Sequence, residues 1–118
     1  MKRSGPTNHQ LKLLLAELES QAPGNKFWRR IADDLKKPSR QRRIVNVYKI
    51  DRFAREGEIV AVPGKVLSTG ELNKKVSVAA FSFSDEARRK VIEAKGKALS
   101  LKELFEQNPE GKKVRILG

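Results

Sequence analysis

The highest density of positively charged side chains in this chain is a cationic run between residues 26 and 43. This stretch holds eight lysines and arginines against Asp33 and Asp34, a surplus of six that is half of the formal net charge of +12. Aromatic and aliphatic residues stand among these cations at helical spacing. One helix could therefore bury an apolar stripe and present a cationic face. Surfaces of this kind bind polyanions, and nucleic-acid phosphates are the commonest polyanions in a cell.

Part of this charge could be neutralised along the helix itself. Arg29 and Asp33 lie four residues apart, as do Arg30 and Asp34. Such pairs contribute only a few tenths of a kcal/mol on a helix surface, so a solvated, self-neutralised face is the alternative interpretation here. Residues 39–43 have no acidic neighbour in the sequence. We expect this segment to be a loop that contacts phosphate.

The cations outside residues 26–43 give weaker evidence of phosphate binding. Lys74 and Lys75 precede a predicted strand, and residues 88–90 form a basic triplet early in a predicted helix. Two i, i+4 pairs with glutamates leave that triplet equally balanced between a solvated face and a phosphate contact. Lys2 and Arg3 belong to a basic arm that we expect to become ordered on binding.

The chain offers few residues that are suited to catalysis. His9 is the only histidine and there is no cysteine, so a zinc site would need oxygen ligands alone. The adjacent acids at 33–34 and 85–86 point in different directions on a helix and make poor acid–base pairs. Residues 64–70 have the wrong order of glycine, lysine and hydroxyl for a phosphate loop. We predict no catalytic residues, no metal site, no cofactor and no small-molecule substrate.

Aromatic residues near the basic run have two interpretations. Phe27 and Trp28 could stack on bases, but their helical spacing with Ile31 and Leu35 favours packing in the core. Tyr48, the only tyrosine, is left undecided between these roles.

Two helices joined by a short turn are predicted to carry the basic run. Thr7 or Asn8 can cap the first, and Asn25 the second. Proline disfavours helical geometry in the residue before it, so Pro38 ends the second helix. The first apolar stripe comprises Leu11, Leu14, Leu15 and Leu18, and the second comprises Phe27, Trp28, Ile31, Ala32 and Leu35.

Short strands and helices are predicted to alternate in the rest of the chain. We expect strands at residues 44–47, 59–62, 76–81 and 114–117, with an extended piece at 65–67 after a break at Pro63-Gly64. Helices are expected at residues 49–55, after Ser84, and after Ser100, where Ser100 and Glu103 form a capping-box pattern. We place Ala98 on the apolar side of the helix that follows Ser84.

These elements predict an α/β fold class: a single domain of short strands and helices in repeated β-β-α-like units, with an N-terminal helical hairpin. Within the domain, 1–118, residues 1–6 form a flexible basic arm, residues 7–43 the helical hairpin and basic loop, and residues 44–118 the α/β core. No apolar run is long enough to span a membrane, and we expect a soluble, intracellular protein with no membrane partner.

Several short motifs resemble one protein family. They are Pro63-Gly64-Lys65-Val66-Leu67 with Gly70 and Leu72, Val76-x-Val78-Ala79-Ala80 with Phe83-Ser84 and Ala87, and Val45-Asn46-Val47 with Lys49-Ile50. The chain resembles the archaeal and eukaryotic large-subunit ribosomal protein eighteen-e, a family related to bacterial large-subunit protein fifteen. The resemblance covers nearly the whole chain and is closest to the archaeal form. Ser68 stands where the family often has glycine, and Ala94-Lys95-Gly96 replaces a commoner Ala-Gly-Gly.

The resemblance implies a structural role in the cytoplasmic ribosome. Its expected partners are large-subunit ribosomal RNA and neighbouring large-subunit proteins, and the free chain is expected to be monomeric. It also implies no catalytic activity and no cofactor. The expected RNA-binding residues are Lys2, Arg3, Arg29, Arg30, Lys36, Lys37, Arg40, Arg42, Arg43, Lys65, Lys74 and Lys75.

One function of another class remains open from the residues alone. The two front helices could form the helix-turn-helix of a DNA-binding regulator. Phe27, Trp28 and Ile31 would then occupy much of the recognition helix and leave few side chains for base edges.

Overall fold

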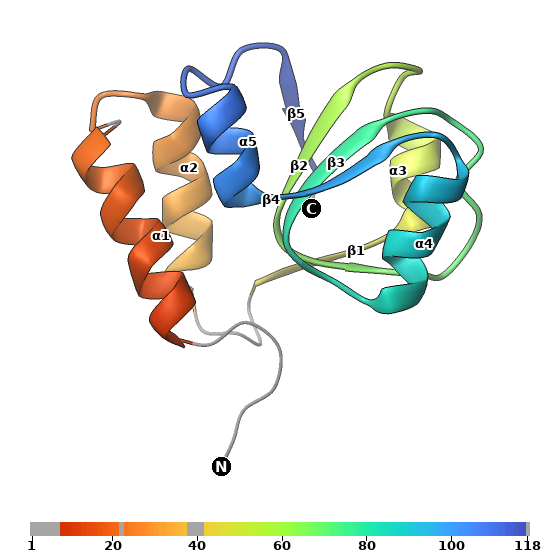
Figure 1. Ribbon diagram of the computed structural model, residues 1–118, viewed down its shortest axis with the longest axis horizontal. Helices are drawn as coiled ribbons and strands as arrows, with labels where there is room; N and C mark the ends of the chain where they lie inside the picture. Colours follow the sequence, from red (N-terminus) through yellow and green to blue (C-terminus); the bar gives the residue numbers. More distant parts are fainter. Residues whose placement is uncertain (1–7, 22, 38–41, 118) are drawn as a thin grey trace.

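A parallel five-stranded sheet forms the middle of three layers, with helices on both of its faces (Figure 1). The computed structural model describes residues 8–21, 23–37 and 42–117. Its elements, in chain order, are α1 (Asn8–Gln21), α2 (Lys26–Leu35), β1 (Arg43–Asn46), α3 (Val47–Phe53), β2 (Ile59–Leu67), β3 (Ser77–Phe83), α4 (Asp85–Glu93), β4 (Lys97–Ser100), α5 (Leu101–Gln107) and β5 (Val114–Ile116).

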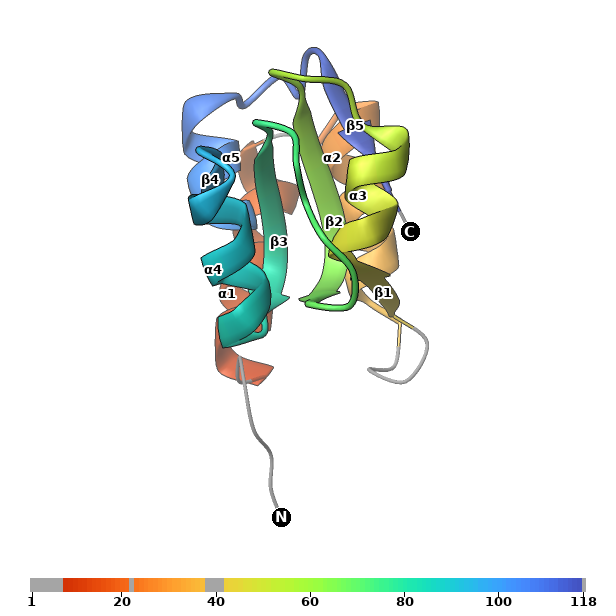
Figure 2. The same ribbon diagram turned by 90° about the vertical axis from the view of Figure 1, so that its right-hand side faces the viewer.

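The sheet separates two hydrophobic cores. Helices α1, α2 and α5 cover one face, and α3 and α4 cover the other (Figures 1 and 2). Because successive side chains of a strand point to opposite faces, Val60 and Val62 of β2 join the core beneath α3 and α4, while Ala61 joins the core beneath α1, α2 and α5. Because helices cover both faces of the sheet, the strands carry apolar side chains on both sides. The predicted α/β fold class with an N-terminal helical hairpin is confirmed.

Trp28 anchors the core beneath the first three helices. Its side chain is completely buried, and its ring packs edge-on against Phe105 at 5.1 Å and against Phe27 at 4.9 Å. The indole Nε1 donates a hydrogen bond to the carbonyl oxygen of Asn108, at 3.3 Å. The prediction that Phe27 and Trp28 serve packing is therefore confirmed.

Strand β2 runs without interruption through Pro63-Gly64, so the predicted break there is wrong. Its first half pairs with β5 and its second half with β1, while β3 follows it along the other side with a register shift between Val62 and Lys65. Pro63 has no N–H to donate and is tolerated at such an irregularity. Gly64 lies directly against the backbone carbonyl of Arg43, where any Cβ would collide. Proline and glycine therefore mark a change of partner strand, not the end of a strand.

Two other boundaries differ from the prediction. Val47 begins α3 instead of ending a strand, so the helix predicted at 49–55 spans Val47–Phe53. Ala98 lies in β4, a strand that the prediction missed, and not on the helix after Ser84. The two apolar residues of this four-residue strand, Ala98 and Leu99, are neighbours that are half-buried on opposite faces of the sheet, so the strand shows no apolar–polar alternation that could be recognised in isolation.

Helix α4 ends in a Schellman motif that explains this error. The N–H of Gly96 donates to the carbonyl of Val91 at 3.0 Å, and the N–H of Lys95 donates to that of Ile92 at 2.9 Å. Lys95 adopts a φ of 71°, a left-handed conformation that favours glycine. Gly96 passes so close to the carbonyl oxygen of Val76 that a Cβ would collide with it. The chain therefore turns directly from α4 into β4.

We predict that Lys95→Gly stabilises the protein by about 0.5–1 kcal/mol, because glycine relieves the left-handed strain at this position. Gly96→Ala should destabilise it by about 2 kcal/mol or more, because the new methyl group meets the Val76 backbone. Urea denaturation of the two variants checks both signs. A Lys95→Gly variant no more stable than wild type would contradict the strain argument.

Candidate nucleic-acid interface

The basic run folds mainly into α2, whose two sides have opposite character. Asn25 caps the helix, its Oδ1 accepting a hydrogen bond from the N–H of Trp28 at 3.0 Å. Trp28, Ile31 and Leu35 are completely buried on the inner side. The exposed residues of the outer side are Lys26, Arg29, Arg30, Asp33, Lys36 and Lys37. We call this set the α2 basic face; it combines five cations with one acid.

Lys26 belongs to this face although it is absent from the predicted set of contacts. It stands four residues before Arg30, so the same helical spacing that grouped the other cations could have identified it.

The ion pairs expected along α2 do not form among the described residues. Instead, Lys36 bonds Glu19 of α1 at 2.9 Å, and Lys37 lies 3.2 Å from Asp34. The hydrogen bond that Lys36 donates to the Glu19 carboxylate raises the pKa of Lys36. Within the described part of the chain, Arg29 and Arg30 have no ionic partner and remain available to an external anion.

Asp34 is the one buried charged side chain among the described residues, with 6% of its surface exposed. Its carboxylate lies 3.2 Å from Lys37 Nζ and 3.3 Å from Arg43 Nε. Burial opposes ionisation of this carboxyl, but the hydrogen bonds from Lys37 and Arg43 outweigh it and lower the pKa of Asp34 below its usual value of 3.8. Arg43 is therefore not the free cation that the local sequence suggested, because folding brings Asp34 to it.

Arg42 is also engaged by the fold. Its Nε donates to the carbonyl oxygens of Leu35, at 3.2 Å, and Lys37, at 3.1 Å, which lie at the carboxyl end of α2. Its guanidinium carbon lies 5.7 Å from the centre of the Phe81 ring. A cation at this end of a helix satisfies carbonyls that lack an intrahelical donor. Arg42 and Arg43 thus fasten the end of α2 to the sheet, and Arg40, Lys2 and Arg3 lie outside the described residues.

The other predicted contacts fall in two places. Lys65 is exposed on β2 in register with Ile44, one residue after Arg43. Lys74 and Lys75 lie elsewhere, beside the end of α3 on the other side of the sheet. Lys74 Nζ donates to the carbonyl of Ala54 at 3.0 Å, whereas the side chain of Lys75 is exposed. The structure therefore groups Lys65 with the start of β1 and separates Lys74 and Lys75 from it.

The three basic side chains at residues 88–90 all contact other residues of the fold. Arg89 pairs with Glu86 at 2.6 Å and with Glu93 at 2.9 Å. Lys90 Nζ donates to the carbonyls of Ser68 and Gly70, and Arg88 lies over the Phe83 ring at 5.0 Å. These contacts favour the structural interpretation of the triplet.

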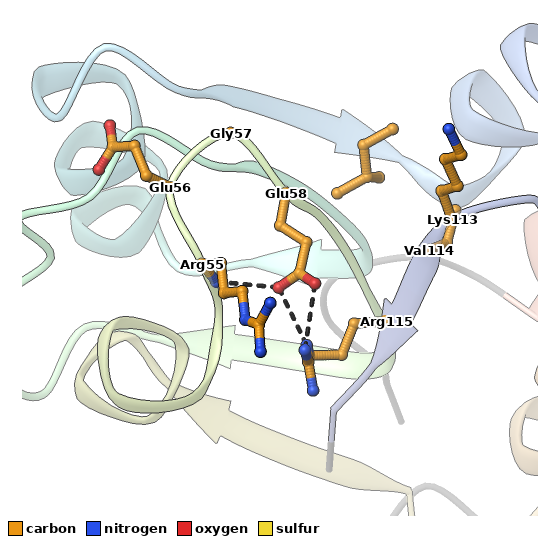
Figure 3. A pocket seen from close by; sticks show the side chains of 8 residues that line it. Arg55, Glu56, Gly57, Glu58, Lys113, Val114 and Arg115 are labelled. Carbon is orange, nitrogen blue, oxygen red and sulfur yellow. Dashed lines mark hydrogen bonds and ion pairs between the residues drawn. The ribbon is translucent and has the colours of Figure 1, made fainter.

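A hollow at the amino-terminal edge of the sheet carries further cations that sequence reasoning missed (Figure 3). Glu58 accepts hydrogen bonds from Arg115 at 2.9 and 3.1 Å, and its Oε1 also accepts the N–H of Arg55 at 2.9 Å. The bond from Arg115 lowers the pKa of Glu58. This ion pair ties β5 to the start of β2. The hollow is therefore a structural junction, with the side chains of Arg55 and Lys113 at its rim.

Comparison with known proteins gives a consistent result. The family of ribosomal protein 60S L18 and 50S L18e matches residues 2–118. A large ribosomal subunit protein eL18 of Pyrobaculum aerophilum is 50% identical over 97% of this chain and 95% of the relative. Proteins of the same name from Sulfurisphaera tokodaii and Halobacterium salinarum are 40% and 45% identical, over 98% and 94% of this chain and 96% and 97% of those relatives.

The chain belongs to the L18/L18e family of ribosomal proteins. The resemblance inferred from the motifs is thus confirmed. Each of the three named relatives is a ribosomal protein, and none supports the DNA-binding alternative.

The described part of this L18-family chain contains no group of three or more histidine, cysteine, aspartate or glutamate side chains placed to hold a metal ion. None of its described helices is both long and apolar enough to cross a bilayer.

We predict that Asp34→Asn destabilises this L18-family protein by about 1–3 kcal/mol at pH 7, because Arg43 and Lys37 lose their carboxylate. The folded pKa of Asp34 lies below the unfolded value. Its stabilising contribution is therefore complete above about pH 4 and is lost as the pH falls through the lower folded pKa. Urea unfolding of both proteins between pH 7 and pH 2.5 should show the difference shrinking only below about pH 4. A constant difference across that range would contradict the assignment.

Proposed function

We propose that this chain is a structural constituent of the large ribosomal subunit in the cytoplasm, where it binds ribosomal RNA through the α2 basic face and the adjoining start of β1. Membership of the L18/L18e family supports the ribosomal part of this proposal. Neighbouring large-subunit proteins are expected partners, and the role requires no catalytic residue or cofactor.

The α2 basic face is the observation that carries the RNA-binding part. The α2 basic face has five exposed cations and a single exposed acid, Asp33. The two acids that pair with its lysines lie outside it, because Asp34 is buried and Glu19 is on α1. Arg29 and Arg30 therefore offer planar donors that are not committed to any described acid. A guanidinium can donate two parallel hydrogen bonds to a phosphate, which suits these arginines to a nucleic-acid backbone.

RNA fits this surface better than sequence-specific DNA reading does. Double-stranded RNA has a deep, narrow major groove, so proteins recognise mainly its phosphates, 2′-hydroxyls and shape. The inner side of α2 is filled by Trp28, Ile31 and Leu35, and its outer side offers chiefly long cationic side chains. Such side chains are well suited to phosphates along a backbone.

Counterion release makes this interface measurable. If about six phosphates are neutralised, log affinity for a structured RNA should fall with log salt at a slope of roughly −4 to −5. Arg29→Ala/Arg30→Ala removes two uncommitted charges and should make that slope shallower by about 1.5–2. Filter binding or fluorescence anisotropy across 50–300 mM KCl gives the slopes.

Lys95→Ala/Lys102→Ala is the matched control, because it removes two exposed charges that lie on other elements, in the turn after α4 and on α5. It should leave the slope nearly unchanged. Equal slopes for wild type and the Arg29→Ala/Arg30→Ala variant would show that the α2 basic face is only a solvated surface.

Assembly into the subunit is a separate expectation. Tagged chain expressed in an archaeal host should co-sediment with large ribosomal subunits through a sucrose cushion containing 0.5 M salt. Recovery of the chain only at the top of the gradient would contradict a structural role in the subunit.

A further inference from the structure

Exposed aromatic side chains gather on a single helix. The chain has one tryptophan, one tyrosine and five phenylalanines, and all of them lie in the described part of the structure. Only Tyr48 and Phe53 are exposed, at 51% and 49% of their surface, and both belong to α3. The remaining aromatic rings are buried or half-buried. The two rings exposed on one short helix therefore differ from all the other aromatic side chains of this chain.

Cations lie between these two rings on the outer side of α3. Val47 and Ile50 are completely buried on the inner side. Helical spacing places residues 48, 52, 49 and 53 in that order across the opposite side. The guanidinium carbon of Arg52 lies 5.5 Å from the centre of the Phe53 ring. We call Tyr48, Lys49, Arg52 and Phe53 the α3 aromatic face.

The α3 aromatic face carries an uncompensated positive charge. Lys49 and Arg52 form no ion pair with any residue that the structure describes. Asp51 is the one acid on α3, and its Oδ1 is occupied as the acceptor of the backbone N–H of Asn73, at 2.9 Å. The face therefore has the charge needed to attract phosphate in addition to rings that can stack.

The fold holds α3 firmly in place. The N–H of Tyr48 donates to the carbonyl of Thr69 at 3.2 Å, and Lys74 bonds the carbonyl of Ala54 just after the helix. Gly70 lies against the backbone and Cβ of Tyr48, and its φ of 94° admits no ordinary side chain there. Rings on a fixed helix lose little conformational freedom when a ligand stacks on them.

We propose that the α3 aromatic face binds unpaired RNA bases, with Tyr48 and Phe53 as stacking partners and Lys49 and Arg52 on the flanking phosphates. Sequence-tolerant stacking on aromatic rings beside cations is how proteins hold unstacked nucleotides. Protein interfaces also favour tyrosine, phenylalanine and arginine, so the rings alone do not choose between the two kinds of partner. The observation that favours RNA is the positive charge of Lys49 and Arg52, which Asp51 does not compensate because it accepts from Asn73. The inference rests on the proposed function, because it assumes that the partner is RNA.

The α3 aromatic face and the α2 basic face lie on opposite sides of the sheet (Figures 1 and 2). One chain would therefore join two RNA segments, a backbone held at α2 and unpaired bases held at α3. This division makes the two contacts separable by mutation.

The test compares two RNAs with the same number of phosphates: a fully paired hairpin and a hairpin that carries a three-adenine bulge. Wild-type protein should bind the bulged RNA more tightly. Tyr48→Ala/Phe53→Ala should weaken bulged-RNA binding about tenfold or more, because alanine cannot stack on the bases. Its affinity for the paired RNA should stay within about twofold, and the salt slope should not change because no charge is removed.

Two further variants make the comparison specific. Tyr48→Phe keeps the ring and should bind bulged RNA like wild type. Leu13→Ala/Ile92→Ala removes two apolar side chains of similar exposure, 58% and 55%, from other helices and should change neither affinity. Thermal unfolding of each variant verifies that the fold is retained.

The inference would be overturned by bulged-RNA binding that Tyr48→Ala/Phe53→Ala leaves unchanged, or by equal weakening toward both RNAs. An unchanged RNA affinity together with weaker co-sedimentation of this variant with large ribosomal subunits would assign the α3 aromatic face to a protein interface. Wild-type binding to the paired RNA without preference for the bulge would refute this inference alone. Failure to bind either RNA would refute the RNA-binding part of the proposed function.

Discussion

The close approach of β1 to β2 at Gly64 is the constraint on which the rest of the structure depends. Strand β2 pairs with β5 over its first residues and with β1 over its last, and the exchange occurs where Gly64 lies against the Arg43 carbonyl. A side chain at position 64 would collide with the Arg43 backbone and push β1 away from β2. The pairing of β1 with β2 places Arg43, the first residue of β1, beside Asp34 near the end of α2. It also sets the position of α3, which begins directly after β1. This one backbone contact thus helps to position the elements next to the α2 basic face and the α3 aromatic face.

The positive charge of the chain is divided between structure and surface. Arg42, Arg43 and Arg115 hold carbonyls or carboxylates within the fold, while Arg29 and Arg30 have no such partner among the described residues. Net charge alone therefore overstates the number of cations available to an anionic ligand. Asp34 is central to this division. It compensates Arg43 and Lys37 at the junction between α2 and the sheet, while Arg29 and Arg30 on the outer side of α2 form no ion pair with a described residue.

The two faces of the sheet suggest two modes of RNA contact. The α2 basic face consists of long, flexible cations, which suit phosphates at many positions along a backbone. The α3 aromatic face combines rings with cations on a helix fixed by backbone contacts from residues 69–75. A protein built this way would act as a rigid spacer between RNA segments, with the parallel sheet setting their separation.

Local sequence determined the helices, their caps and the apolar stripes, because these depend on residues three or four positions apart. Asn25, Ser84 and Ser100 cap helices as their sequence patterns predict. The same local patterns identified the α2 basic face, apart from Lys26, and the family. Tertiary structure alone decided the parallel pairing of strands, the continuity of β2 and the formation of β4. It also brought Asp34 to Arg43 and left Tyr48 and Phe53 open, because contacts between distant segments decide which charges are paired and which rings are covered.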